Sequence, residues 1–283
     1  MGSPEWTPFF CGNGRDRGGF NVIKGKGFPT PMGDASKCHN IRMVVAYDGT
    51  LYHGWQRQKN GISIQEAVEE KIGVMLEEDV KLIASGRTDA GVHAVGQSCH
   101  FETRTELGPD TVKKGLNALL PNDIWVKEAV RTPTSFHARY SARSKTYEYR
   151  ILNREAPDIF LRHYVWHIRS PLDVDKMASC LQSLIGRHDF ASFRSSGSDN
   201  KNPVRTMMRS EIKGLDEQGL LRVVMEADGF LRHMVRNIVG TVVAVGLGKM
   251  DPQAFQQIVA SRDRTMAGIK APARGLFLMN VTY

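Results

Sequence analysis

Hydrophobic and polar positions follow one another in patterns that predict both strands and helices. Residues 41–47 form an apolar, β-branched run, which is typical of a buried strand. Ser63 and Glu66 have the spacing of a capping box, and the apolar positions after them fall on one helical face. Similar patterns predict a helix at about 110–120 and strands at 80–84, 95–103 and 124–130.

The second half of the chain repeats this arrangement in outline, without repeating the identities of the residues. Asp173 is expected to cap a helix at 173–185 that ends at Gly186, and further helices are predicted at about 230–245 and after Pro252. Apolar runs predict strands at 145–152, 207–212, 220–227 and 276–283. Each half mixes several strands with two longer helices, as a split βαβ unit does. We therefore predict an α+β fold of mainly antiparallel strands, covered by helices on one side.

Residues 1–40 differ from the rest of the chain. They are rich in Gly and Pro and show neither a helical nor a strand period. We expect a disordered or extraneous N-terminal extension here. Residues 41–144 and 145–283 are then the N-terminal and C-terminal halves of one α+β catalytic region.

The composition excludes several classes of protein. Of the 283 residues, 41% are hydrophobic and 24% are charged, as is ordinary for a globular protein. No run of 18 apolar residues predicts a membrane span, and no signal peptide is recognised. The four cysteines form no CxxC pair, so we expect reduced thiols in a cytoplasmic protein, without a structural metal site.

The net charge is positive, because 38 Lys and Arg residues face 30 Asp and Glu residues, which leaves +8. This surplus is compatible with a polyanionic partner such as RNA. It does not identify one, since many enzymes that touch no nucleic acid are equally basic.

The segment GRTDAGVHA, residues 86–94, is the first candidate for chemistry. It lies between two predicted strands, its glycines permit tight turns, and Asp89 is its one carboxylate. The alternative is that Asp89 only caps backbone groups in a turn, as Asp commonly does.

A second candidate is Arg236, which stands beside the apolar stripe of the long predicted helix. A buried Arg requires a carboxylate partner, because an isolated charge is very costly to bury. The alternative is a surface Arg whose guanidinium reaches the solvent.

Tyr147 and Tyr149 are a third feature, since side chains two residues apart on a strand share a face. Alternating aromatic residues usually form a core. Here, however, basic residues surround them, and this combination suits base stacking and phosphate contact: Arg139, Arg143, Lys145 and Arg150.

With these residues in view, the chain resembles the pseudouridine synthases of the TruA type. Residues 86–94 look like the catalytic motif of that family. Further segments of the family stand in family order at residues 46–50, 52–56, 136–141, 189–193, 233–240 and 275–278. The resemblance covers about residues 41–283, and residues 1–40 have no counterpart in it.

The resemblance implies an isomerase, an intramolecular transferase that converts uridine to pseudouridine at positions 38, 39 and 40 in the anticodon stem-loop of tRNA. The C–N glycosidic bond breaks, the uracil turns, and its C5 joins C1′. No atom is gained or lost, so no cofactor and no metal is implied. Family members are homodimers with two similar, ferredoxin-like halves that form one continuous sheet. The implied partners are therefore tRNA and a second copy of the chain, without a membrane.

Site residues follow from the same resemblance. Asp89 is the nucleophile or essential carboxylate, and whether it attacks C1′ or the reaction passes through a glycal stays open. Arg236 is the buried partner of Asp89. Tyr147 stacks on the target base and could take the C5 proton, and Arg87 helps to extrude the uridine. His93 and Arg139 are further expected substrate contacts.

The expected RNA surface and the rival functions complete these predictions. Candidate phosphate contacts are Arg57, Lys59, Arg139, Arg143, Lys145 and Arg150. Three alternatives are a related synthase with another RNA target, a non-catalytic RNA-binding protein on the same scaffold, and a glycoside hydrolase. A hydrolase needs a second carboxylate as acid, and the loop offers only Asp89.

Overall fold

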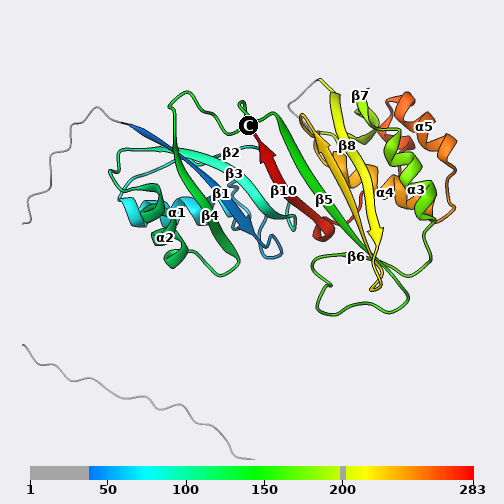
Figure 1. Ribbon diagram of the computed structural model, residues 1–283, viewed down its shortest axis with the longest axis horizontal. Coiled ribbons are helices and arrows are strands. Elements are labelled where there is room, and N and C mark those ends of the chain that lie inside the picture. The colour runs from blue at the N-terminus through cyan, green and yellow to red at the C-terminus, as the bar shows by residue number, and fades with distance from the viewer. Residues whose placement is uncertain (1–37, 198–201) are drawn as a thin grey trace, which may run out of the picture. The chain divides into compact units, whose positions relative to one another are not determined.

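A mixed sheet of ten strands organises the computed structural model, which describes residues 38–197 and 202–283. Residues 38–283 form one compact unit. The strand order is β4-β1-β3-β10-β5-β9-β8-β7, and β2 and β6 add to β3 and β5 respectively (Figure 1). The pairs are antiparallel except β10 with β3 and β6 with β5.

The elements follow one another in a regular order. The strands are β1 (His39–Tyr47), β2 (Ile83–Ala84), β3 (His93–Thr103), β4 (Ile124–Thr132), β5 (Ser144–Asn153), β6 (Trp166–Ile168), β7 (Gly186–Asp189), β8 (Val204–Leu215), β9 (Leu220–Ala227) and β10 (Leu276–Thr282). The helices are α1 (Ile64–Leu76), α2 (Pro109–Leu119), α3 (Val174–Gln182), α4 (Met234–Gly246) and α5 (Pro252–Ser261), with short 3₁₀ turns at Ala191–Phe193, Arg264–Met266 and Ala273–Gly275.

The strand β10 lies at the centre of the sheet and joins its two sides. Phe277 pairs in parallel with His93 of β3, and Leu278 pairs in antiparallel fashion with Tyr147 of β5. In Figure 1 this strand, coloured red, runs between the strands of the left and right parts. The strands that carry the predicted site residues are therefore brought together by β10.

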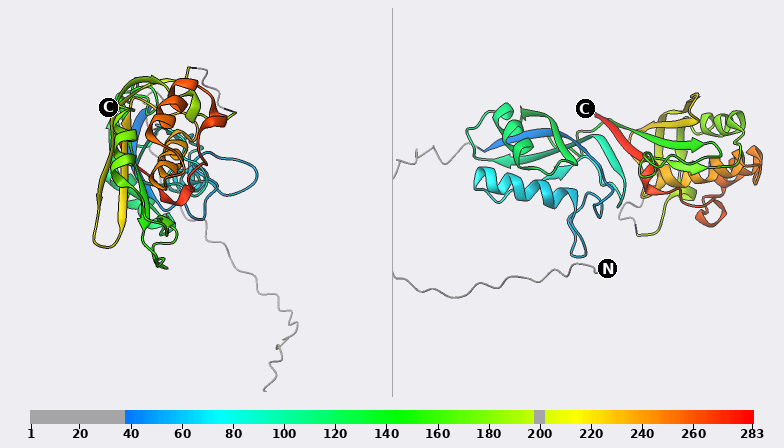
Figure 2. Two further views of the ribbon diagram at one scale, coloured as in Figure 1. Left: turned by 90° about the vertical axis from the view of Figure 1, so that its right-hand side faces the viewer. Right: turned by 90° about the horizontal axis from the view of Figure 1, so that it is seen from below.

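Helices cover the sheet and bury its apolar face. The helices α3, α4 and α5 stand on one side of β8 and β9 (Figure 2). The buried face of α4 matches the predicted apolar stripe, since Ile238, Val242 and Val245 are buried. The prediction of an α+β fold, with a mainly antiparallel sheet flanked by helices, is confirmed. The division at residue 144 stays a prediction; β5 begins there.

Local signals predicted most element boundaries well. Ser63 caps α1 by accepting a hydrogen bond from the Glu66 amide at 3.2 Å, as the capping box indicated. The predicted extension lies outside the described residues up to residue 37, while His39 and Asn40, assigned to it, belong to β1.

Two predicted elements differ most from the structure in extent, and two short strands were not predicted, each for a local reason. The strand at 80–84 is reduced to β2, because the Glu69 side chain, rather than a strand, takes the Leu82 amide. The helix expected to end at Gly186 ends at Gln182, and Gly186 opens β7 with a φ of +108°. The strands β6 and β7, of three and four residues, are too short for their periodicity to be recognised.

Candidate active site

The loop between β2 and β3 is held in place by residues 47–55. The Trp55 amide donates to the Thr88 carbonyl at 3.0 Å, and the Tyr47 hydroxyl is 2.8 Å from Thr88 Oγ1. Gly54, with a φ of +87°, lies so close that a Cβ there would be 2.6 Å from the Thr88 carbonyl oxygen. Only glycine fits this contact. The backbone of Asp89 thus rests on a second loop, whose supporting role sequence reasoning did not predict.

Asp89 and Arg236 form a direct ion pair. Arg236 Nη1 donates to Asp89 Oδ2 at 2.8 Å, and Arg236 Nε donates to the Ala271 carbonyl at 2.8 Å. The Arg236 side chain is 10% exposed and that of Asp89 32%. The long helix therefore carries its buried Arg to the loop, and the second bond fixes the guanidinium.

His233 is a further neighbour of Asp89 to which sequence reasoning gave no role. Its Nε2 lies 3.4 Å from the same oxygen, Oδ2. Burial raises the pKa of Asp89, but hydrogen bonds and charge from His233 and Arg236 outweigh it, so the pKa lies below its usual value. Asp89 is therefore ionised at neutral pH. The sequence did contain a signal for His233, since residues 233–240 form one of the family segments.

Tyr147 lies on β5 within the electrostatic reach of Asp89. It is 7% exposed, and its ring packs edge-on against Phe230 at a centroid distance of 5.0 Å. Burial, with the nearby negative charge of Asp89, raises its pKa, so the phenol is neutral. Tyr149, two residues on, is buried and donates its hydroxyl to the Pro272 carbonyl at 2.7 Å. Of the two tyrosines, Tyr147 is the one at the site.

A group of cations lies at the start of the loop. Lys145 Nζ donates to the Ser85 carbonyl at 2.6 Å. Burial, together with the charges of Arg139 and Arg205, lowers the pKa of Lys145 to about 8. We call Arg139, Lys145 and Arg205 the basic cluster. Sequence reasoning did not single out Arg205, because it comes from β8, some sixty residues beyond Lys145.

Arg87 and His93 stand at opposite ends of the loop and in opposite environments. Arg87 is exposed and makes no ion pair within the described part of the chain. His93 is 1% exposed, and its ring stacks on Phe277 at 4.6 Å. Its Nδ1 accepts from the Gly49 amide at 3.1 Å, and its Nε2 faces the carbonyls of His163 and Arg274. The structure thus places His93 in the framework, away from Asp89.

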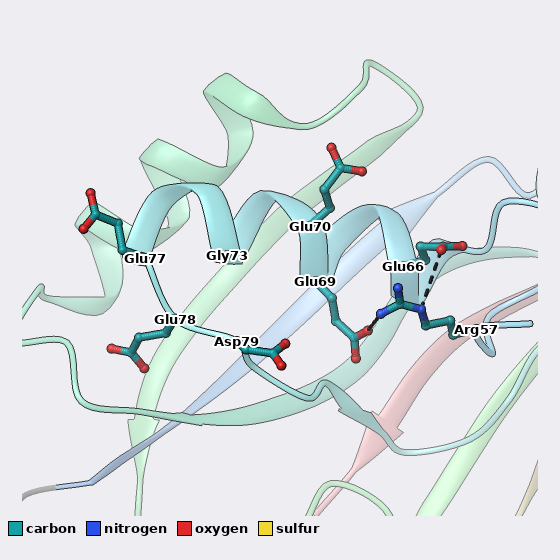
Figure 3. Close-up of a pocket in the computed structure, with 8 residues that line it drawn as sticks. All are labelled: Arg57, Glu66, Glu69, Glu70, Gly73, Glu77, Glu78 and Asp79. Carbon is teal, nitrogen blue, oxygen red and sulfur yellow. Dashed lines mark ion pairs between the residues drawn. The ribbon is translucent and has the colours of Figure 1, made fainter.

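Two of the predicted phosphate contacts are occupied by other partners. The Arg150 guanidinium lies 3.9 Å over the Phe277 ring and pairs with Glu148 at 2.8 Å. Arg57 stands between Glu66 and Glu69, at 3.6 and 3.7 Å. It lies in an open hollow along α1 whose other charged groups are all carboxylates (Figure 3): Glu66, Glu69, Glu70, Glu77, Glu78 and Asp79. By contrast, Lys59, Arg139 and Arg143 are exposed.

Two further features are absent from the described residues. No helix there has the length and apolar character that crossing a membrane requires. In the same residues no three His, Cys, Asp or Glu side chains are grouped to hold a metal ion.

Comparison with known proteins identifies the family of the chain. Residues 43–141 and 180–283 match the tRNA pseudouridine synthase family. The chain is 44% identical over 244 residues to tRNA pseudouridine synthase A of Thermoanaerobacter sp. (strain X514), which covers 86% of this chain and 99% of that protein. It is 43% identical, with the same coverage, to the enzymes of that name from Acetivibrio thermocellus and Geotalea daltonii.

The family match and the fold are those of a pseudouridine synthase, an isomerase of uridine. The chain belongs to the tRNA pseudouridine synthase family and, within it, to the TruA type. The resemblance stated from the motifs is thereby confirmed. Among solved structures, a chain of a Cbf5–Nop10–Gar1 complex is similar at 16% identity and a TM-score of 0.33, over 72% of this chain and 45% of that one.

Proposed function

We propose that this enzyme isomerises uridine to pseudouridine at positions 38, 39 and 40 of the tRNA anticodon stem-loop. The observation that carries the proposal is the ionised Asp89, paired with the buried Arg236 at 2.8 Å. The relatives of the chain are named for action on tRNA. The pairing also argues against a non-catalytic RNA-binding protein, which has no use for a buried ion pair beside a neutral tyrosine.

Within this proposal Asp89 supplies the reactive carboxylate. Its Oδ2 is occupied by Arg236 and His233. No side chain or backbone group among the described residues bonds Oδ1, and a third of the side chain is exposed. Oδ1 is therefore the oxygen that faces the ribose of the substrate. Either route, attack on C1′ or passage through a glycal, uses the ionised form that the lowered pKa maintains.

Tyr147 contacts the target base, and Arg87 fills the space that the extruded base leaves. The raised pKa of Tyr147 keeps its phenol protonated, so it packs against the uracil more readily than it accepts the C5 proton. Arg87, exposed and two residues before Asp89, is placed to enter the stem when the uridine is extruded. Taking the target base out of the stack is required because its C1′ and C5 are enclosed in an RNA helix.

Charge distribution supports one orientation of the RNA. The basic cluster adjoins the loop that carries Asp89, whereas the hollow along α1 in Figure 3 is lined mainly by carboxylates. Phosphates are attracted to the first surface and repelled by the second. We therefore place the RNA across the loop and the basic cluster. His93 belongs to the framework that shapes the loop rather than to this contact surface.

A homodimer in the cytoplasm is part of the same proposal. It follows from the resemblance to family members that bind RNA across two subunits. Light scattering of the purified protein measures its mass in solution directly, and a monomer at all concentrations contradicts the dimer.

Transcripts of the anticodon stem-loop test the proposed positions. With 5-tritiated uridine at position 38, 39 or 40 alone, each substrate should release tritium, because joining C5 to C1′ expels the C5 hydrogen. A uridine placed elsewhere in the same loop is the control. Release only from other positions would favour the alternative of a related synthase with another target.

Lys145 should couple RNA binding to proton uptake. Since its pKa is about 8, it is largely neutral at pH 9, and a phosphate nearby restores its proton. We expect affinity for the stem-loop to fall up to about tenfold between pH 8 and pH 9 at constant salt. The reason is that binding coupled to the uptake of one proton weakens by at most tenfold for each unit of pH. Filter binding measures this. Lys145→Arg, which stays charged, should remove the dependence, and an unchanged pH dependence in that variant would exclude Lys145 as a phosphate contact.

A further inference from the structure

The backbone of His233 is unusual for its position in the fold. Among the described residues, three other than glycine have a positive φ: Glu77, His233 and Arg262. Glu77 and Arg262 are the C-caps of α1 and α5, where a left-handed residue commonly ends a helix. His233, at a φ of +62°, stands at the N-terminal end of α4, and its side chain caps nothing there. Helix termination therefore does not account for its conformation.

The side chain of His233 also differs from that of a structural histidine. His93 satisfies both ring nitrogens with backbone groups. In His233, by contrast, Nδ1 is buried and has no hydrogen-bond partner. Within the described residues, the one polar contact of its ring is Nε2 with Asp89 Oδ2 at 3.4 Å. Left-handed backbone and an unsatisfied nitrogen both cost stability, and neither is offset by a framework contact.

We propose that His233 is a positioning residue that fixes the orientation of the Asp89 carboxylate. This inference rests on the proposed function. One group on Oδ2 lets the carboxylate turn about its Cβ–Cγ bond, whereas a second group on the same oxygen restricts that rotation. With Arg236 Nη1 and His233 Nε2 both on Oδ2, Oδ1 points to the substrate. The left-handed backbone is what brings the imidazole, one turn before Arg236, to the same oxygen.

This arrangement predicts a change in the ionisation of Asp89. The charged and titratable groups that face its carboxylate are Arg236 and His233 at Oδ2 and the phenol of Tyr147, all from the second half of the chain. Removing the donor at 233 takes away a group that favours the carboxylate, so the pKa of Asp89 rises toward its usual value. The acid limb of the pH–rate profile should then move to higher pH.

Two substitutions distinguish the effect of the His233 hydrogen bond from the effect of the shape of its ring. His233→Phe keeps the shape and loses the donor, while His233→Gln keeps a donor at the place of Nε2. We expect single-turnover rates with a stem-loop transcript to fall roughly 10- to 100-fold in His233→Phe, the loss usual for a hydrogen bond to a charged group, with unchanged RNA affinity. The rate should largely return in His233→Gln. A Phe variant as fast as wild type, or a Gln variant as slow as Phe, overturns the proposal.

Glycine variants control for folding. His233→Gly and Glu77→Gly each place glycine at a left-handed position, which glycine adopts readily, so neither should melt at a lower temperature. Only His233→Gly should lose rate. The pKa of Asp89, measured by carbon NMR of its carboxyl without RNA, should rise in His233→Phe. The NMR measurement does not depend on which RNA the enzyme modifies. An Asp89 pKa that is the same in His233→Phe and in wild type contradicts the positioning role.

Discussion

Asp89→Asn should abolish pseudouridine formation while tRNA binding stays close to that of wild type. The amide has the size of the carboxylate but no negative charge, and Asp89 is the only carboxylate of its loop. We expect tritium release to fall by at least about three orders of magnitude, roughly 4 kcal/mol of transition-state stabilisation. Filter binding should show the same dissociation constant, because phosphate contacts supply most of the affinity.

Asp48→Asn is a matched control for this experiment. Asp48 lies on the supporting loop, its side chain is 30% exposed against 32% for Asp89, and its pKa is also below the usual value, since burial is outweighed by hydrogen bonds from Thr50 and Tyr164. The Asp48→Asn variant should keep most of the wild-type turnover even if its melting temperature is lower. Activity of Asp89→Asn within tenfold of wild type would remove Asp89 from the chemistry.

Arg236→Met should show how much of the reactivity of Asp89 depends on its partner. Methionine keeps length and apolar contact but removes the charge and both hydrogen bonds, to Asp89 and to Ala271. The pKa of Asp89 then rises, because burial is opposed by His233 alone once the hydrogen bond and the charge of Arg236 are lost. Turnover at neutral pH should drop strongly, and the acid limb should move upward. Adding Asp89→Asn should cost little more, since residues that act as one unit are not additive.

Stability gives an independent measurement on the same variant. The pair is partly exposed on the Asp89 side, so the loss of unfolding free energy should lie between the roughly 1 kcal/mol of exposed pairs and the roughly 3–5 kcal/mol of buried ones. Arg150→Met is the control, because Arg150 also pairs with a carboxylate, packs over the Phe277 ring and lies outside the site. Normal turnover with unchanged stability in Arg236→Met would show that the pair has no role.

The sequence predicted those features that local physics determines. An Arg beside an apolar helical stripe requires a carboxylate, and the family segments named Asp89 as that carboxylate. The capping of α1 and the core stripe of α4 follow from spacing alone. The capping and the core stripe needed no knowledge of which distant segments meet, whereas the pairing of Asp89 with Arg236 came from the family resemblance.

Features that depend on distant contacts could not be predicted in the same way. His93 has the composition of a site residue, but its burial follows from Phe277 and from two carbonyls about 70 and 181 residues away. The sequence makes Arg57 a candidate phosphate contact, yet in the structure its guanidinium pairs with carboxylates of α1. His233 lies 3.4 Å from Asp89 with a left-handed backbone, and a histidine gives no sign of that conformation in a sequence.

The central place of β10 has a consequence for folding. Asp89 and Arg236 are 147 residues apart, and neither β3 nor β5 has its inner neighbour until β10 inserts between them. Contacts of such sequence separation close late and slowly, because their loop entropy must be lost first. The two sides of the molecule can therefore acquire helices and strands while the enzyme is still inactive. Competence for catalysis arises with the insertion of this one strand, so regain of activity on refolding should lag behind regain of secondary structure.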